Sequence, residues 1–181
     1  MAYRALQVPI PNEGTIQDFG TSLGLWVSAF EILAHPSHRK VQLTDVLDLL
    51  AQAKWVKPRL RHRRFIVKYR NHRRSATLAE RVYAAVYSAR NTFLHGNPVR
   101  VKDWKFTHSA IETAVGNLAP LIYRTALMCY LGWDIDRRLA QRMAGVVSYH
   151  NGWHPEFQLV DFVIAWANQQ YEDALLRLYS A

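Results

Sequence analysis

The sequence Tyr-Ser-Ala-Arg-Asn-Thr-Phe-Leu-His-Gly, which runs from Tyr87 to Gly96, has the features of the last turns of a helix. Gly96 adopts a left-handed backbone conformation at little cost, and Pro98, which follows shortly after, cannot continue a helix. Asn91 and His95 are four residues apart, so a helix places them on one face, one turn apart. The stretch therefore predicts a helix end that carries an arginine, an amide and an imidazole.

The residues before this stretch extend the same helix back to about Thr77. Apolar side chains recur at helical spacing along it, and a second, partly aromatic stripe lies beside them. The first stripe is Leu78, Val82, Ala85, Ala89 and Phe93, and the second is Tyr83, Tyr87 and Leu94. Tyr87 either packs or contacts a phosphate, and packing is the commoner role for an aromatic side chain on a helix. We therefore predict a helix over residues 77–95.

An earlier helix is predicted over residues 16–34, and it is expected to be central. Its apolar residues are spaced three and four apart without a break: Ile16, Phe19, Leu23, Trp26, Phe30 and Leu33. Glu31 is the only acidic residue between Asp18 and Asp45. It lies either at the rim of the helix or as a buried partner of a basic group such as Arg90, because a partly buried charge needs a partner.

The remaining segments complete a helical pattern. An extended lead-in is predicted over residues 1–14, followed after the first long helix by a short helix with Thr44 as its N-cap. A further helix is predicted over about 109–130, where Gly116 or Pro120 breaks or kinks it. The remaining elements are a short helix over 134–143, a loop over 148–155 and a last helix over about 156–179. No alternating strand pattern of convincing length is present. The sequence therefore predicts an all-α bundle of five to seven helices, in a single domain that spans residues 1–181.

Composition narrows the class of protein. A single cysteine, Cys129, excludes an internal disulfide and a cysteine-rich zinc site. The N-terminus has no charged-then-apolar signal segment, and the apolar stretches are too short or interrupted for a membrane span, so we expect a cytoplasmic protein without a membrane partner. His150 and His154 have the spacing of metal ligands, but Gly152 and Pro155 argue against a helix that would align them. We therefore expect no metal site and no cofactor.

The positive charge is concentrated in one segment. Residues 54–74 hold ten of the 23 Lys and Arg residues and no acid, which leaves 13 basic against 14 acidic residues elsewhere. Such a block is typical of a surface that faces a polyanion, and aromatic and aliphatic residues within it anchor part of it to the core. The alternative is an ordinary solvated helix face. The candidate contacts to a nucleic acid or another phosphate-rich partner are Lys57, Arg59, Arg61, Arg63, Arg64, Lys68, Arg70, Arg73 and Arg74.

An arginine followed five residues later by a histidine is weak information by itself, because this composition produces such a pair by chance about once. The added Asn91, the helix stop after His95 and the helical surroundings give the pattern its weight. With them, the sequence Tyr-x-x-Arg-Asn-x-x-x-His-Gly over residues 87–96 resembles the HEPN domain family. The sequence Leu-Trp-x-x-x-Phe-Glu-x-Leu over residues 25–33 is similar to the first helix of the Apea-like branch of that family.

This resemblance covers residues 16–96 in its signatures, and it implies a HEPN-like helical bundle that acts as a metal-independent endoribonuclease. In such an enzyme the motifs of two subunits of a homodimer meet in one cleft. The cations of the basic segment would then be assigned to RNA binding, because they would hold the RNA backbone. His95 would act as general base or acid when a ribose 2′-hydroxyl attacks the adjacent phosphate, and Arg90 would stabilise the charge of the transition state. Asn91 would orient the phosphate or His95, with Glu31 and Tyr87 in support. The products would be a 2′,3′-cyclic phosphate and a 5′-hydroxyl.

Other functions remain open at this point. A HEPN-like domain can also serve as a non-catalytic module for RNA binding, nucleotide binding or dimerisation, because a fold does not determine a function. In that case Arg90 would pair with Glu31 and His95 would only close the helix. A DNA-binding regulator is a third alternative, although no helix-turn-helix pattern is visible. The family resemblance is also compatible with a toxin or antiviral role, with an antitoxin or a sensor protein as a further partner.

Overall fold

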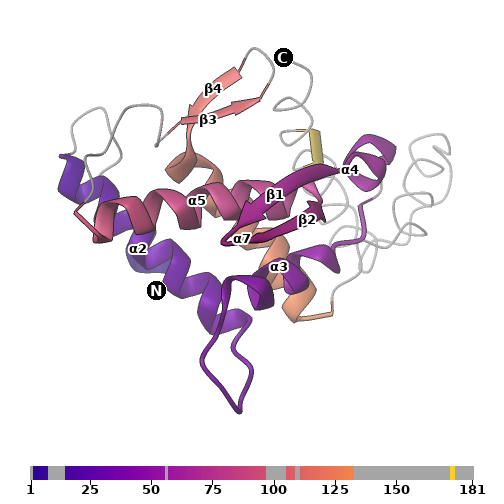
Figure 1. Ribbon diagram of the computed structural model, residues 1–181, viewed down its shortest axis with the longest axis horizontal. Helices are drawn as coiled ribbons and strands as arrows, with labels where there is room; N and C mark the ends of the chain where they lie inside the picture. The colour runs from indigo at the N-terminus through magenta and orange to yellow at the C-terminus, as the bar shows by residue number, and fades with distance from the viewer. Residues whose placement is uncertain are drawn as a thin grey trace, which may run out of the picture.

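Three helices make up the centre of the molecule, α2 (Ile16–Leu33), α5 (Leu78–Leu94) and α7 (Val115–Tyr130). Each of them packs against the other two (Figure 1). The computed structural model describes residues 2–7, 15–55, 57–96, 105–108, 111–132 and 172–173. Within this part of the chain the protein is mostly helical, as the hydrophobic periodicity predicts.

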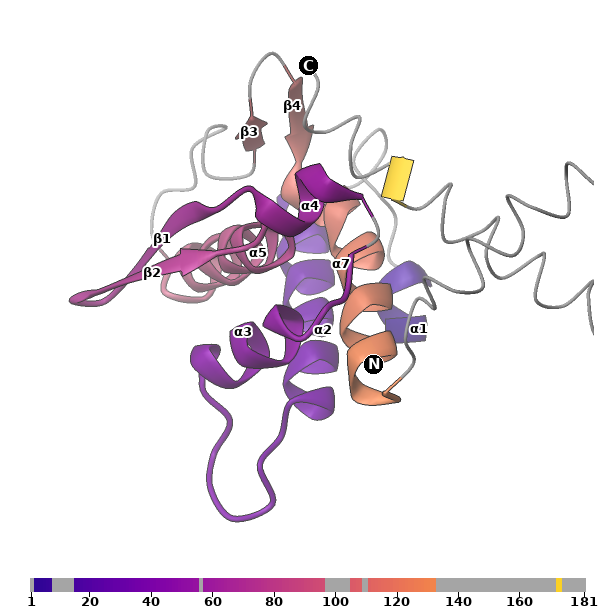
Figure 2. The same cartoon turned by 90° about the vertical axis from the view of Figure 1, so that its right-hand side faces the viewer.

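The smaller helices surround this centre. Helix α1 (Ala2–Gln7) packs on α2, and α3 (Leu43–Ala51) packs on α5 and α7. Helix α4 (Pro58–His62) is a single short turn in the basic segment, with Pro58 at its first position. Figure 2 shows α3 lying across the central helices near one end of α2.

Local sequence signals begin and end the two main helices. Thr15 caps α2 and Thr77 caps α5, and in each case the acid three residues on, Asp18 or Glu80, bonds back to the backbone of the cap residue. These are capping boxes, which satisfy two backbone N–H groups at each helix start. After α5, Gly96 has a φ of 63°, the left-handed conformation that the sequence predicted for it.

The packing partners determine the directions of the helices. The Phe30 and Tyr83 rings have centroids 4.7 Å apart, while Gly20, near the start of α2, lies against the ring of Phe93 near the end of α5. Helices α2 and α5 are therefore antiparallel. Tyr123 of α7 contacts the same Phe30 ring, with centroids 5.3 Å apart. One aromatic cluster thus joins all three central helices.

The prediction of an all-α fold was wrong in one respect, because the described residues include two antiparallel hairpins. The first pairs β1 (Phe65–Tyr69) with β2 (His72–Ala76), and the second pairs β3 (Lys105–His108) with β4 (Ile111–Ala114). The first hairpin closes through Arg70 and Asn71, without the glycine that usually marks such a turn. Strand β1 (Phe-Ile-Val-Lys-Tyr) is rich in strand-forming residues, but β2 (His-Arg-Arg-Ser-Ala) is largely polar, so the pair shows no alternating pattern.

Three further predictions of local structure need correction. Residues 2–7 form α1 instead of an extended lead-in, because Ala5 is buried against the core. Helix α3 begins at Leu43 with Gln42 as its cap, because the Asp45 carboxylate accepts the Gln42 backbone N–H at 2.7 Å, so Thr44 is not the cap. The predicted helix over 109–130 begins only at Val115, since residues 111–114 pair with β3, and it continues through Pro120.

The C-terminal predictions fall mostly outside the described residues. The helix over 134–143, the loop with His150 and His154, and most of the helix over 156–179 lie there. Glu172 and Asp173 are helical, and they lie within the range predicted for the last helix. Among the described residues, no helix is long and apolar enough to cross a membrane.

Candidate active site

The three motif residues lie at the C-terminal end of α5. Arg90 and Asn91 are in its last turns, and His95 is the residue that closes the helix. The His95 backbone N–H donates to the Asn91 carbonyl at 3.1 Å, and the side chain of His95 is exposed. No hydrogen bond to the His95 imidazole comes from any described residue. The imidazole is therefore free to meet a substrate at this surface.

Asn91 holds the side chain of Arg90 in place. The Arg90 Nη1 group donates to the Asn91 Oδ1 atom at 2.9 Å. The centre of the guanidinium also lies 6.0 Å from the centroid of the Tyr87 ring, at the outer limit of a cation–π contact. Arg90 Nε is buried and has no hydrogen-bond partner in the described part of the chain. Asn91 and Tyr87 therefore position the guanidinium, and its Nε–H donor has no acceptor among the described residues.

Glu31 of α2 faces this cluster from the neighbouring helix. It is half-buried, and burial raises its pKa, while the positive charge of Arg90 acts in the opposite direction. Among the described residues no ion pair within 4.0 Å joins Glu31 to Arg90, so the two interact through space. Glu31 is therefore neither an exposed residue at the helix rim nor a direct ion-pair partner of Arg90. It is a half-buried acid close enough to feel the charge of Arg90.

Tyr83 belongs to the same cluster, although the sequence analysis placed it only in the aromatic stripe and not among the candidate site residues. Its ring is fully buried, and its hydroxyl has no hydrogen-bond partner among the described residues. Burial and the nearby charge of Glu31 raise the pKa of Tyr83 far above its usual range, so the hydroxyl keeps its proton. The signal that could have found it is its position four residues before Tyr87 and seven before Arg90, on one helical stripe.

The arrangement has the groups needed for chemistry on a phosphate ester. A guanidinium that never loses its proton suits phosphate oxygens, and an exposed imidazole can accept or donate a proton. The Asn91 amide donates nothing to Arg90, so its NH₂ group is available for a phosphate oxygen. No group of three or more metal-binding side chains occurs among the described residues.

The basic segment is divided between α4, the first hairpin and their connections. Most of the cations assigned to RNA binding are exposed, as predicted for a polyanion-facing surface. The exposed ones are Arg59, Arg61, Arg63, Arg64, Lys68, Arg70 and Arg73. Two others have acidic partners. Lys57 forms an ion pair with Asp173, and its backbone N–H donates to the buried carboxylate of Glu172 at 2.9 Å.

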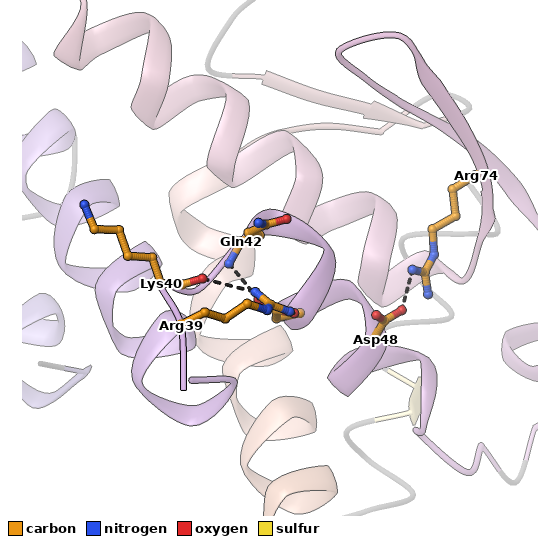
Figure 3. Close-up of polar contacts among 6 residues, drawn as sticks. Arg39, Lys40, Gln42, Asp48 and Arg74 are labelled. Atoms are coloured by element: carbon orange, nitrogen blue, oxygen red, sulfur yellow. Dashed lines mark hydrogen bonds and ion pairs between the residues drawn. The ribbon is translucent and has the colours of Figure 1, made fainter. Parts of the chain in front are cut away.

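Arg74 joins the hairpin to two helices. Its Nη1 atom lies 2.5 Å from Asp48 Oδ1 of α3 (Figure 3). Its Nε atom donates to Glu80 Oε1 of α5 at 2.9 Å. Glu80 is almost fully buried, while the Asp48 carboxylate is largely exposed. Arg74 therefore holds the hairpin on the helices, and the exposed cations are more accessible to a partner than Arg74 and Lys57.

The motif residues lie at the C-terminal end of α5, whereas the first hairpin contacts the residues at its N-terminal end. Arg74 binds Glu80, and the Arg81 guanidinium lies 4.7 Å from the Phe65 ring, both near the start of the helix. His95 closes the other end, about 20 Å along a helix that rises 1.5 Å per residue. A polyanion held by the hairpin could therefore reach the motif only if it extended along α5.

Comparison with known proteins adds no relative: the chain matches no protein-family model, no curated protein and no solved structure.

Proposed function

We propose that this protein is a metal-independent endoribonuclease of the HEPN type, which cleaves RNA through attack of a 2′-hydroxyl on the neighbouring phosphate. The observation that carries the proposal is the exposed His95 imidazole one turn beyond an Arg90 side chain that Asn91 holds in place. These groups share one helix end, and none of them needs a metal ion for the chemistry.

The proposed reaction assigns a role to each residue. His95 takes the proton from the 2′-hydroxyl as that oxygen bonds to phosphorus, and the bond from phosphorus to the 5′-oxygen breaks. Arg90 stabilises the charge on the phosphate oxygens in the transition state, and Asn91 orients the phosphate. A second imidazole protonates the departing 5′-oxygen. The products are a 2′,3′-cyclic phosphate and a 5′-hydroxyl.

A homodimer would supply the second imidazole. The motif of one chain carries a single histidine, and the reaction needs both a base and an acid. Two copies that meet at the C-terminal ends of their α5 helices would bring two His95 side chains to one phosphate. The exposed cations of the basic segment would then attract the RNA backbone. We propose that a protein with this activity acts in the cytoplasm as a toxin or an antiviral effector.

The test is cleavage of a labelled single-stranded RNA in the presence of EDTA. We expect the parent protein to leave cyclic phosphate ends, and His95→Ala and Arg90→Ala each to slow cleavage about 100-fold or more. His38→Ala is the matched control, because His38 is an exposed histidine in the loop after α2. Cleavage that EDTA abolishes, or that survives in both motif variants, would overturn the assignment.

One observation favours a second candidate, a non-catalytic RNA-binding module of the same fold. Arg90 already bonds to Asn91 and interacts with Glu31, so its charge has a structural use without any substrate. Under this alternative the protein binds RNA in a salt-sensitive manner but never cuts it. Cleavage and binding measured on the same RNA therefore separate the two candidates.

A further inference from the structure

The first hairpin carries cations on the face that points away from the helices. Val67 and Ala76 are buried, and the residues that alternate with them are exposed. Lys68 and Arg73 stand directly opposite each other in the register of the two strands, and both are exposed. Like charges in this position destabilise a pair of strands. An anion bound between them would remove that penalty.

The tip of the hairpin adds a third cation in an unfavourable backbone conformation. Arg70 has a φ of 49°, in the left-handed region that side-chain-bearing residues rarely adopt. Glycine or asparagine is the usual residue at such a position in a two-residue hairpin turn. Ile66, on the same face as Lys68, is 65 % exposed. The tip thus combines features that lower stability in the free protein and that favour contact with a partner.

Two rings flank the turn. Tyr69 is the last residue of β1 and His72 is the first residue of β2. Their ring centroids lie 5.6 Å apart, with the planes inclined by 32°. Tyr69 is half-buried and His72 is exposed. Because side chains alternate along a strand, this pair lies on the opposite face of the ribbon from Lys68 and Arg73, and both pairs lie within two residues of the turn. Unpaired bases stack on such rings whatever their identity, because every base has a π-face.

The base of the hairpin is firmly attached, while its tip projects from the body. Arg74 bonds to Asp48 and Glu80, and the Arg81 guanidinium lies between the rings of Phe65 and Phe106, 4.7 and 5.1 Å from their centroids. Figure 2 shows the far end of β1 and β2 extending beyond α5. The cations and rings at the tip are therefore held ready for a partner without a folding step.

We propose that the β1–β2 hairpin is an arm that binds single-stranded RNA that passes over the turn. Lys68, Arg70 and Arg73 contact its phosphates, and an unpaired base stacks on the Tyr69–His72 pair at the other face of the ribbon. This inference rests on the proposed ribonuclease function for the choice of RNA. Duplex RNA fits poorly, because its bases are already stacked and its major groove is too deep and narrow for a ribbon to read. Duplex DNA would admit a ribbon in its major groove, but it would leave the ring pair without a base.

Binding is measured by fluorescence anisotropy in a His95→Ala background, so that cleavage does not consume the probe. The probe is a labelled single-stranded RNA of roughly 16 nucleotides. The double variant Lys68→Gln/Arg73→Gln should bind more weakly, and its dependence of log K on log salt should be flatter by about 1.4. Arg4→Gln/Lys40→Gln is the matched control, because it removes two exposed cations outside the segment and should leave the slope unchanged.

The stacking step has its own test in His72, because substitutions at exposed positions usually change stability little. His72→Ala should weaken binding about tenfold, whereas His72→Phe, which keeps a ring, should bind nearly as tightly as the parent. Equal loss in both variants would overturn the stacking assignment. Tighter binding of duplex RNA or duplex DNA of the same sequence would overturn the single-strand assignment.

The outcomes also separate this inference from the proposed function. If the parent cuts RNA while the hairpin variants bind as the control does, the arm is refuted and the ribonuclease stands. If the hairpin variants lose binding as expected but the parent never cuts RNA, the arm stands and the catalytic proposal fails.

Discussion

Replacing Arg74 by methionine should destabilise the protein without removing a contact to RNA. Arg74 is the only described residue that forms ion pairs with both α3 and α5, through Asp48 and Glu80. Methionine keeps most of the side-chain length but none of the charge. The change therefore leaves the Glu80 carboxylate, which is 2 % exposed, without its cationic partner.

The two ion pairs should differ in strength because their burial differs. Removing one partner of a buried pair typically costs 3–5 kcal/mol. The Glu80 carboxylate still receives the Thr77 backbone N–H at 2.7 Å, and the Arg74 side chain is 25 % exposed. We therefore expect Arg74→Met to cost about 2–3 kcal/mol, below the usual range. The Asp48 carboxylate is 64 % exposed, so Asp48→Asn should cost at most about 1 kcal/mol.

The assay is urea unfolding of the single and double variants of Arg74, Glu80 and Asp48. The double-mutant cycle should give a coupling of about 1.5–2.5 kcal/mol between Arg74 and Glu80, and less than about 0.5 kcal/mol between Arg74 and Asp48. The reasoning would be refuted by equal couplings, or by an Arg74→Met variant as stable as the parent. The folded Arg74→Met protein should keep the salt dependence of RNA binding, since Arg74 points toward the helices.

Two further predictions concern α2. Gly20→Ala should lower the free energy of unfolding by about 1–3 kcal/mol, because a Cβ there would lie 2.3 Å from the Phe93 ring. Gly24→Ala should raise it by about 0.5–1 kcal/mol, because a Cβ there would meet no described atom within 4 Å apart from its chain neighbours and the backbone of its own helix. Thermal unfolding measures both changes, and equal shifts would contradict this reasoning. Burial raises the pKa of Glu31, so the folded state holds that proton more tightly than the unfolded state does and the parent loses stability as the pH rises through this pKa. The free energy of unfolding of Glu31→Gln minus that of the parent should therefore be larger at about pH 7 than at about pH 4. Urea titrations at both pH values measure this difference, and a difference independent of pH would contradict the prediction.

The sequence determined the two helices that carry the candidate site. Helix α2 follows from an apolar seam without a break, and α5 follows from Thr77, Glu80 and Gly96, which act on the backbone within a few residues of themselves. Because these effects are local, the placement of Arg90, Asn91 and His95 at one helix end could be predicted. Cap residues and helix-ending glycines act in the same way whatever the tertiary structure around them.

The hairpins could not be predicted with the same means. Strand β2 is mostly polar, and its pairing with β1 depends on register and on the burial of Val67 and Ala76 against α5. Arg74 holds it there through Asp48, which lies 26 positions away in the sequence. A block of charges in the sequence does not show which cations have acidic partners, and only the tertiary structure shows that Lys57 and Arg74 do.

The surroundings of Arg90 show the same division. The sequence by itself determined that Arg90, Asn91 and His95 share the end of a helix, because helical geometry relates residues one turn apart. Only the tertiary structure decided that Glu31 meets this cluster and that the Tyr83 hydroxyl is buried beside it, because both depend on the antiparallel packing of α2 on α5. Local backbone preferences are encoded residue by residue, whereas burial and charge pairing arise only when distant segments come together.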